Sequence, residues 1–233
     1  MNLDLSQFFS EYEALVAQVD AVFKKVSGNF VSEVRCKEGC SDCCHALFDL
    51  TLIEAMYLNS KFSGLAEIRR NEVLIEADKA DRKAQLLKRK VSKDAAEVDQ
   101  AEILMRTAKE RLRCPLLDLG DKCALYDYRP ITCRIYGIPL EIGGKSHTCG
   151  LSGFEPGRPY PAVKLERIQD MLLLLSNRVL DAVGSKYDDF RLMHVPVSTA
   201  LMTVYSDGYF GCSDSLDQDS TVAAVDESGG QNA

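Results

Sequence analysis

The chain has 233 residues, of which 46% are hydrophobic and 27% charged, so it can bury one sizeable core. Its formal net charge of -7 argues against a protein that binds nucleic acid by broad neutralisation of phosphates. Residues 206–233 hold six acidic residues and no Lys or Arg, so taking these six charges from -7 leaves -1 for the body.

The first residues lack the basic and apolar regions of a signal peptide, and the longest apolar run is only Met171 to Leu175. We therefore expect no membrane span and a cytoplasmic location. In a reducing compartment, nine cysteines favour metal binding or catalysis over a disulfide framework.

Residues 5–27 carry apolar side chains at helical spacing, so we expect an amphipathic helix there that ends at Gly28. Thr51 and Glu54 then stand in the T-x-x-E pattern of a capping box. That pattern predicts a second helix that begins after Thr51 and runs to about Lys61.

Residues 65–113 are rich in Ala, Leu, Glu, Lys and Arg, and they predict helix throughout. Because this stretch is longer than a typical helix, we expect a break near Val91 and Ser92, with Ser92 as the next N-cap. The two helices would form a hairpin inserted into the domain. The basic pair Arg69-Arg70 is expected to lie on a solvated helix face.

Residues 114–162 lose this periodicity and are rich in Gly, Pro, Tyr and Cys, a composition typical of loops around a site. Pro130 is expected at the first position of a short helix, which would put Cys133 in the first turn. The positive end of that helix and the flanking Arg129 and Arg134 would stabilise a Cys133 thiolate.

Residues 164–183 predict a further amphipathic helix that Gly184 stops. Pro196 then opens a short last helix that runs to about Tyr205. After Tyr205, small polar and acidic residues dominate and offer little to bury.

Together these elements predict a mainly α fold, a helical domain with irregular cysteine-rich loops around a metal site. We expect a single domain over residues 1–205, with the helical hairpin inserted at about 65–113. Residues 206–233 would form a disordered acidic tail.

Eight of the nine cysteines form two groups along the chain, and four thiols within nine residues exceed what core packing requires. On a helix, the first three would share one face, and the fourth would point roughly 100° away from the third. We call C-x3-C-x2-C-C the first block and C-x8-C-x9-C-x15-C the second. The first block holds Cys36, Cys40, Cys43 and Cys44, and the second holds Cys114, Cys123, Cys133 and Cys149.

Neither block has the paired C-x2-C spacing of a zinc ribbon or zinc finger. Thiolate ligands suit zinc and iron–sulfur clusters alike, so the metal stays open, as does the choice between two four-thiolate sites and one cluster with spare redox thiols. His45 and His147 stay open as further ligands, although ordinary hydrogen-bonded roles are more common for such histidines. Cys212 is expected not to be a ligand.

The pattern as a whole resembles the YkgJ-type cysteine-cluster family. The likeness covers roughly residues 36–149 and implies a zinc- or iron-chelating domain. A related pattern in flagellin lysine-N-methylase leaves room for an enzyme, and the helical segment between the blocks departs from the family. The matching residues are the first block, Cys114-Pro115-Leu116-Leu117, Cys123, Tyr126, Arg129-Pro130, Cys133-Arg134 and Tyr136-Gly137.

We therefore predict a cytoplasmic metal-binding protein whose two cysteine blocks come together to hold zinc or an iron–sulfur cluster. A protein-modifying enzyme and a thiol redox sensor are the alternatives, and whether the chain is an enzyme stays open. No Gly-rich nucleotide fingerprint follows a predicted strand, which argues against the usual way of binding S-adenosylmethionine. No nucleic-acid or membrane partner is expected, and a protein partner stays open.

Overall fold

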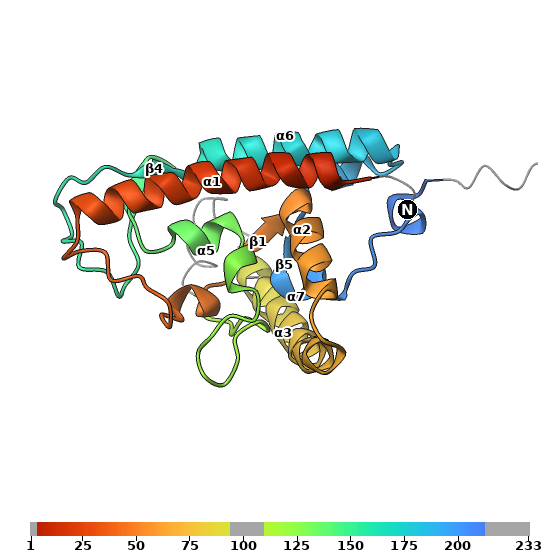
Figure 1. Ribbon diagram of the computed structural model, residues 1–233, viewed down its shortest axis with the longest axis horizontal. Coiled ribbons are helices and arrows are strands. Elements are labelled where there is room, and N and C mark those ends of the chain that lie inside the picture. The colour runs from red at the N-terminus through yellow and green to blue at the C-terminus, as the bar shows by residue number, and fades with distance from the viewer. Residues whose placement is uncertain (1–3, 94–109, 213–233) are drawn as a thin grey trace, which may run out of the picture.

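The computed structural model describes residues 4–93 and 110–212, and it is mainly α, as predicted (Figure 1). Two long helices, α1 (Ser6–Asn29) and α6 (Leu165–Val183), lie side by side along one side of the molecule. An ion pair between Glu11 of α1 and Arg178 of α6 joins them. Most of the remaining elements lie on one side of this pair of helices, and neither helix of the pair contains a cysteine.

Helix α2 (Leu52–Ser63) lies at the centre of the fold and is buried along most of its length. Ile53 and Met56 pack into a core with α1, α6 and the short helix α5 (Ile131–Ile135). Its other side packs into a second core with α3 (Glu67–Lys93) and α7 (Val197–Met202). Burial on several sides fits the few charged residues in α2.

Short strands tie distant parts of the chain together. Strand β1 (Asp49–Thr51) pairs antiparallel with β5 (His194–Pro196), with Leu50 opposite Val195. In a second sheet, β2 (Leu140–Ile142) lies between an antiparallel and a parallel neighbour, β3 (Lys145–His147) and β4 (Val163–Lys164). The described residues also contain three short 3-10 helices: η1 (Asp42–His45), η2 (Tyr126–Tyr128) and η3 (Asp188–Leu192).

The predicted capping box is confirmed, because Thr51 and Glu54 satisfy each other's groups at the start of α2. Helix α6 ends where predicted, at Gly184, whose φ of 68° is a left-handed conformation that favours glycine. The stop predicted at Gly28 is wrong. Helix α1 continues through Gly28 to Asn29, since Val26 is still buried and its carbonyl accepts from the Phe30 N–H.

The helical segment between the cysteine blocks differs from prediction in two places. Helix α3 includes Val91 and Ser92 and its described part ends at Lys93, so Ser92 is not the predicted N-cap of a further helix. Residues 110–113 are extended instead of helical, because Arg111 forms an isolated β-bridge with Ala46. The predicted second helix of the hairpin lies outside the described residues.

The packed body extends past Tyr205. Helix α7 ends at Met202, and a single-turn helix α8 (Asp207–Phe210) follows, with the Phe210 side chain fully buried. Cys212 then donates its thiol hydrogen to the Val183 carbonyl at 2.9 Å. The expected disordered tail after this point lies outside the described residues.

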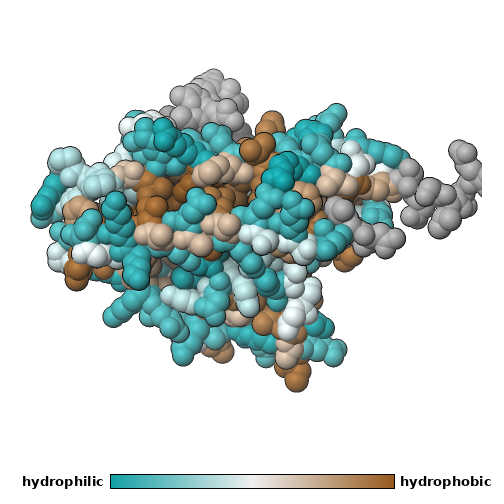
Figure 2. Space-filling view, turned by 45° about the horizontal axis from the view of Figure 1, so that its top comes forward, coloured by the Kyte–Doolittle hydropathy of each residue, from teal (hydrophilic) through white to brown (hydrophobic). Residues whose placement is uncertain are grey.

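The surface is largely hydrophilic, with apolar side chains gathered in a few places on the face that Figure 2 shows. On α6, Met171 and Leu174 are exposed apolar side chains. No helix in the described part of the chain combines the length and the apolar character that a bilayer crossing requires.

Candidate metal centre

A short antiparallel contact brings the two cysteine blocks together. Ala46 bridges Arg111, and the Leu112 N–H donates to the His45 carbonyl at 2.9 Å. The Cys114 N–H donates to the Cys44 carbonyl at 2.6 Å. A ligand candidate of the first block is therefore bonded through its backbone to one of the second block.

The first block is not helical along its length, so the condition under which its first three thiols would share one helix face is not met. Gly39 has a φ of 85°, a left-handed conformation that interrupts any helix between Cys36 and η1. Cys36 instead lies against Gly137, where an added β-carbon would stand 2.3 Å from the β-carbon of Cys36. Glycine at position 137 is what allows this close approach.

Replacing Gly137 with Ala should therefore displace Cys36. We expect a loss of about 1–3 kcal/mol in the free energy of unfolding, because the new methyl group meets the start of a side chain that cannot swing away. Urea unfolding of the metal-free chain measures this loss. Gly150→Ala is the matched control, since no atom lies within 4 Å of its new β-carbon. Equal stability of the two variants would contradict the expected displacement.

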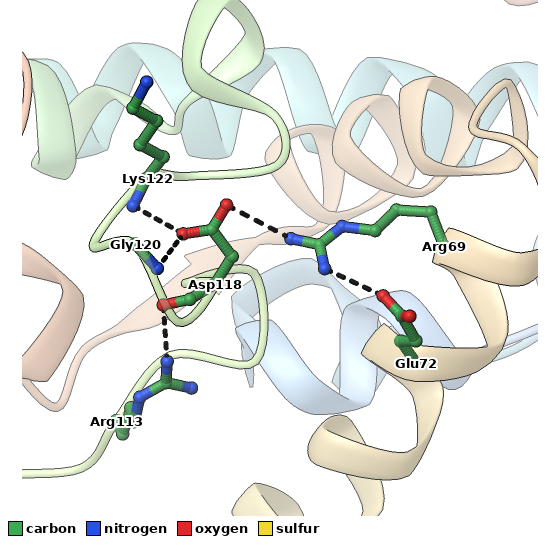
Figure 3. Close-up of polar contacts among 6 residues, drawn as sticks. All are labelled: Arg69, Glu72, Arg113, Asp118, Gly120 and Lys122. Atoms are coloured by element: carbon green, nitrogen blue, oxygen red, sulfur yellow. Dashed lines mark hydrogen bonds and ion pairs between the residues drawn. The ribbon is translucent and has the colours of Figure 1, made fainter.

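A tight loop returns Cys123 toward Cys114. One carboxylate oxygen of Asp118 accepts from the backbone N–H groups of Gly120 at 2.8 Å and of Lys122 at 2.9 Å (Figure 3). The Lys122 N–H is the main reason that the pKa of Asp118 lies below its ordinary value. Leu117 forms a β-bridge with Cys123, which closes the loop.

Charged side chains brace this loop from two sides. Arg113 donates to the Asp118 carbonyl at 2.8 Å, and Arg69 lies 3.8 Å from the second carboxylate oxygen (Figure 3). Arg69 also pairs with Glu72 at 2.9 Å, so it is engaged in contacts within the fold. Its neighbour Arg70 donates to the carbonyls of Ser63 and Leu65.

Cys133 lies in the first turn of α5, as predicted, with Pro130 one position earlier than expected, at the N-cap. The start of this helix is held by Glu54, whose Oε1 accepts from the Ile131 N–H at 3.1 Å. The same carboxylate caps α2 through Thr51, so one buried side chain connects two helix starts. The capping pattern identified Glu54 locally, and its distant partner carries no sequence signal.

Five cysteines line one pocket of about 50 Å³, which we call the five-cysteine pocket. Two of them, Cys43 and Cys44, are buried, and leucine, proline and valine side chains supply much of the remaining wall. Its sulfur-bearing residues are Cys43, Cys44, Cys114, Cys123 and Cys133.

A second pocket of about 20 Å³ adjoins the first, and we call it the four-cysteine pocket. Cys43 lines both pockets, so the eight predicted cysteines line two pockets that have one residue in common. Each pocket draws on both blocks, and neither block forms a site by itself. The cysteines of the second pocket are Cys36, Cys40, Cys43 and Cys149.

Comparison with known proteins gives a family match over this part of the chain. Residues 35–150 match the CxxCxxCC family model, which is described as a "Putative zinc- or iron-chelating domain". The chain belongs to the CxxCxxCC family. Its own first block has three residues, not two, between the first pair of cysteines. No curated protein and no solved structure matches the chain.

Within the CxxCxxCC domain, the thiols differ sharply in acidity. Hydrogen bonds from Cys133 and Cys44 lower the pKa of Cys43 well below its ordinary value, and the Arg129 charge adds to this effect. The same hydrogen bonds, together with burial, raise the pKa values of Cys44 and Cys133. Burial also raises the pKa of Cys114 to about 12. Ionising several of these thiols together therefore requires added positive charge.

The two predicted arginines have different roles. Arg129 lines the five-cysteine pocket, and its guanidinium lies 3.6 Å from the centre of the Tyr126 ring. Arg134 instead pairs with Asp20 of α1 at 2.7 Å and donates to the Arg129 carbonyl at 2.8 Å. The prediction that both arginines stabilise the thiolates is supported for Arg129, whereas Arg134 fastens α5 to α1.

Cys149 has an acidic partner that the sequence analysis missed. Its thiol donates to Asp42 Oδ2 at 3.0 Å, while Arg111 pairs with Asp42 Oδ1. Burial, followed by this hydrogen bond, raises the pKa of Cys149 to about 11. The position of Asp42 within the first block, between Cys40 and Cys43, was the available signal.

The two candidate histidines are not part of either pocket lining. His45 has Nδ1 3.0 Å from the Ser41 carbonyl, and His147 lies in β3. Cys212 lies at the end of α6, where it contacts Val183.

Across residues 4–93 and 110–212, no group of three or more His, Cys, Asp or Glu side chains is arranged to hold a metal ion as it stands. The sulfur atoms share pockets but would have to draw together around an ion. The type of donor nevertheless fits, because thiolates are ligands that zinc and iron–sulfur clusters both accept. The structure thus brings thiols, a donor type that these metals accept, to the walls of two pockets.

Proposed function

We propose that this chain binds zinc or an iron–sulfur cluster in the five-cysteine pocket, with ligands from both cysteine blocks. The observation that carries the proposal is the meeting of five thiols in one pocket, although up to 90 residues of chain separate the first and last of them. Ordinary core packing does not require sulfur at so many neighbouring positions.

Charge supports a cation in this pocket. Metal-ligating cysteines must be deprotonated, and here burial and mutual contact oppose the ionisation of most of the thiols. A bound metal supplies the missing positive charge, and Arg129 offsets part of the negative charge that four thiolates leave over. Zinc would serve to stabilise the loops, whereas an iron–sulfur cluster would add electron transfer.

Pocket size favours chelation over the enzyme alternative. The cysteine-lined pockets measure about 50 and 20 Å³, whereas pockets for drug-sized ligands and cofactors span roughly 300–1,000 Å³. The described pockets suit ions better than S-adenosylmethionine. We place the protein in the cytoplasm, where reducing conditions keep thiols free to bind metal.

Thiol redox sensing is a second candidate, and the contact between Cys43 and Cys133 is the observation that favours it. A Cys43 thiolate could attack hydrogen peroxide and form a sulfenic acid with release of hydroxide. The Cys133 thiol would then displace water from that sulfenic acid and close a disulfide. This candidate requires that the pocket be free of metal.

Anaerobic purification followed by metal, acid-labile sulfide and thiol analysis tests the proposal. We expect at least one zinc per chain, or iron with matching sulfide, and we expect Cys212→Ser to retain it, because Cys212 lies outside both pockets. Metal-free protein that also fails to take up added Zn²⁺ or Fe²⁺ would refute chelation. If its thiol titre fell by two per chain under mild peroxide, redox sensing would replace it.

A further inference from the structure

We propose that the four-cysteine pocket is a second metal site, in which the Asp42 carboxylate is a ligand beside three thiols. The thiols are those of Cys36, Cys40 and Cys149. This inference rests on the proposed function, since it assigns a second centre to the same chelating domain. It adds a carboxylate ligand that the cysteine pattern does not contain.

Cys43 lines both pockets, but it packs with the thiols of the larger one. Cys43 and Cys44 form one buried cluster, and Cys114 and Cys133 pack against it. All of these residues line the five-cysteine pocket, and so does Arg129. Once Cys43 serves that pocket, the other retains three thiols, one fewer than a closed tetrahedral site needs.

The Asp42 carboxylate contacts one of these three thiols. Asp42 Oδ2 lies 3.0 Å from Cys149 Sγ. Oxygen and sulfur ligands bound tetrahedrally to one zinc ion stand about 3.6 Å apart, given Zn–O and Zn–S bonds of about 2.1 and 2.3 Å. A small outward movement of either group would therefore admit an ion between them, with the thiol proton leaving as the metal binds.

Asp42 also makes an ion pair within the fold. Its Oδ1 pairs with Arg111, which lies on the strand-like segment before Cys114, so the carboxylate could merely join two parts of the chain. The Arg111 side chain is 48% exposed, and ion pairs that accessible contribute little to stability. The Asp42 side chain is only 15% exposed, and Oδ2 points at a thiol.

These donors define the chemistry of the site. Three thiolates and one carboxylate suit zinc, with an oxygen ligand that is harder than sulfur. The five-cysteine pocket can supply sulfur ligands alone. The two centres should therefore differ in affinity and in the spectrum of bound Co²⁺, which substitutes for zinc and reports sulfur ligation by charge-transfer absorption.

A Co²⁺ titration of the full-length, metal-free chain under anaerobic conditions tests the inference. We expect two equivalents per wild-type chain and one per Asp42→Asn chain, with the weaker step lost. Arg111→Met breaks the same ion pair and keeps the carboxylate, so it should still bind two. Asp42→Cys should restore the second equivalent with stronger sulfur charge-transfer absorption.

The outcomes separate the two proposals. One equivalent in the wild type, or two equivalents in Asp42→Asn with an unchanged spectrum, overturns the mixed-ligand site and leaves chelation in the five-cysteine pocket standing. Loss of the second equivalent in both Asp42→Asn and Arg111→Met overturns it as well, because the ion pair would then be responsible. A wild-type chain that binds no Co²⁺ overturns both proposals.

Discussion

Replacing Cys43 with Ser is expected to be the most damaging single cysteine substitution for metal binding. Cys43 lines both pockets, and it is the thiol whose surroundings most favour the thiolate. Serine has a similar size but lacks the sulfur ligand. The four thiols that remain in the five-cysteine pocket are ones whose ionisation is opposed by burial and by contact with other thiols. We expect the affinity for the first metal, the one bound in the five-cysteine pocket, to fall at least about 100-fold, measured by competition with a chromophoric chelator.

Two other cysteines supply the matched comparison for Cys43→Ser. Cys40→Ser changes only the four-cysteine pocket, so it should spare the first metal. Cys212→Ser lies at the end of α6 and should change no metal affinity. If Cys43→Ser bound the first metal as tightly as the wild type, the assignment of Cys43 to the five-cysteine pocket would be wrong.

Local signals explain what the sequence could predict. The Thr51-x-x-Glu54 box and the glycine stop at Gly184 are contacts within a few residues, so a short stretch contains all the information needed. The spacing of the cysteines identified the candidate ligands for the same reason. The structure then places all eight of them around two adjoining pockets.

Contacts between distant segments explain what the sequence could not predict. The backbone hydrogen bond from the Cys114 N–H to the Cys44 carbonyl sets the register in which the two blocks pair, and this register decides which thiols meet. Nothing in the sequence near either residue encodes it. Arg134 looked like a partner of the thiolates because it adjoins Cys133, yet Asp20 of the distant α1 binds it. Whether the first block is a helix was likewise left open by its spacing, and the structure shows that it is not, because Gly39 adopts a left-handed conformation.

Composition misled at the C-terminal end. Acidic and small residues follow Tyr205, so a tail was expected from residue 206, but Phe210 fills a core position among α1, α6 and neighbouring aromatic rings. A single buried aromatic side chain can anchor a short polar segment, because it buries a large apolar area. Average composition over a window does not register one such residue.

Replacing Glu54 with Ala is expected to lower the free energy of unfolding by about 3 kcal/mol, measured by urea titration. The Glu54 side chain is 2% exposed, and its carboxylate accepts from the N–H groups of Thr51 and Ile131. Alanine would leave both donors buried without this partner at the starts of α2 and α5. Since α5 carries Cys133, the metal-binding pocket should loosen along with the fold.

Glu54→Gln is the control that separates the carboxylate's shape from its charge. Burial raises the pKa of Glu54 above its ordinary value of 4.5, so the folded chain holds the proton more tightly than the unfolded chain. The stability that this proton contributes is complete below pH 4.5 and disappears as the pH rises through the folded pKa. Relative to wild type, metal-free Glu54→Gln should therefore gain stability as the pH rises from about 4 to 7. A stability difference that stays constant over this range would show that the pKa of Glu54 is the same in the folded and the unfolded chain.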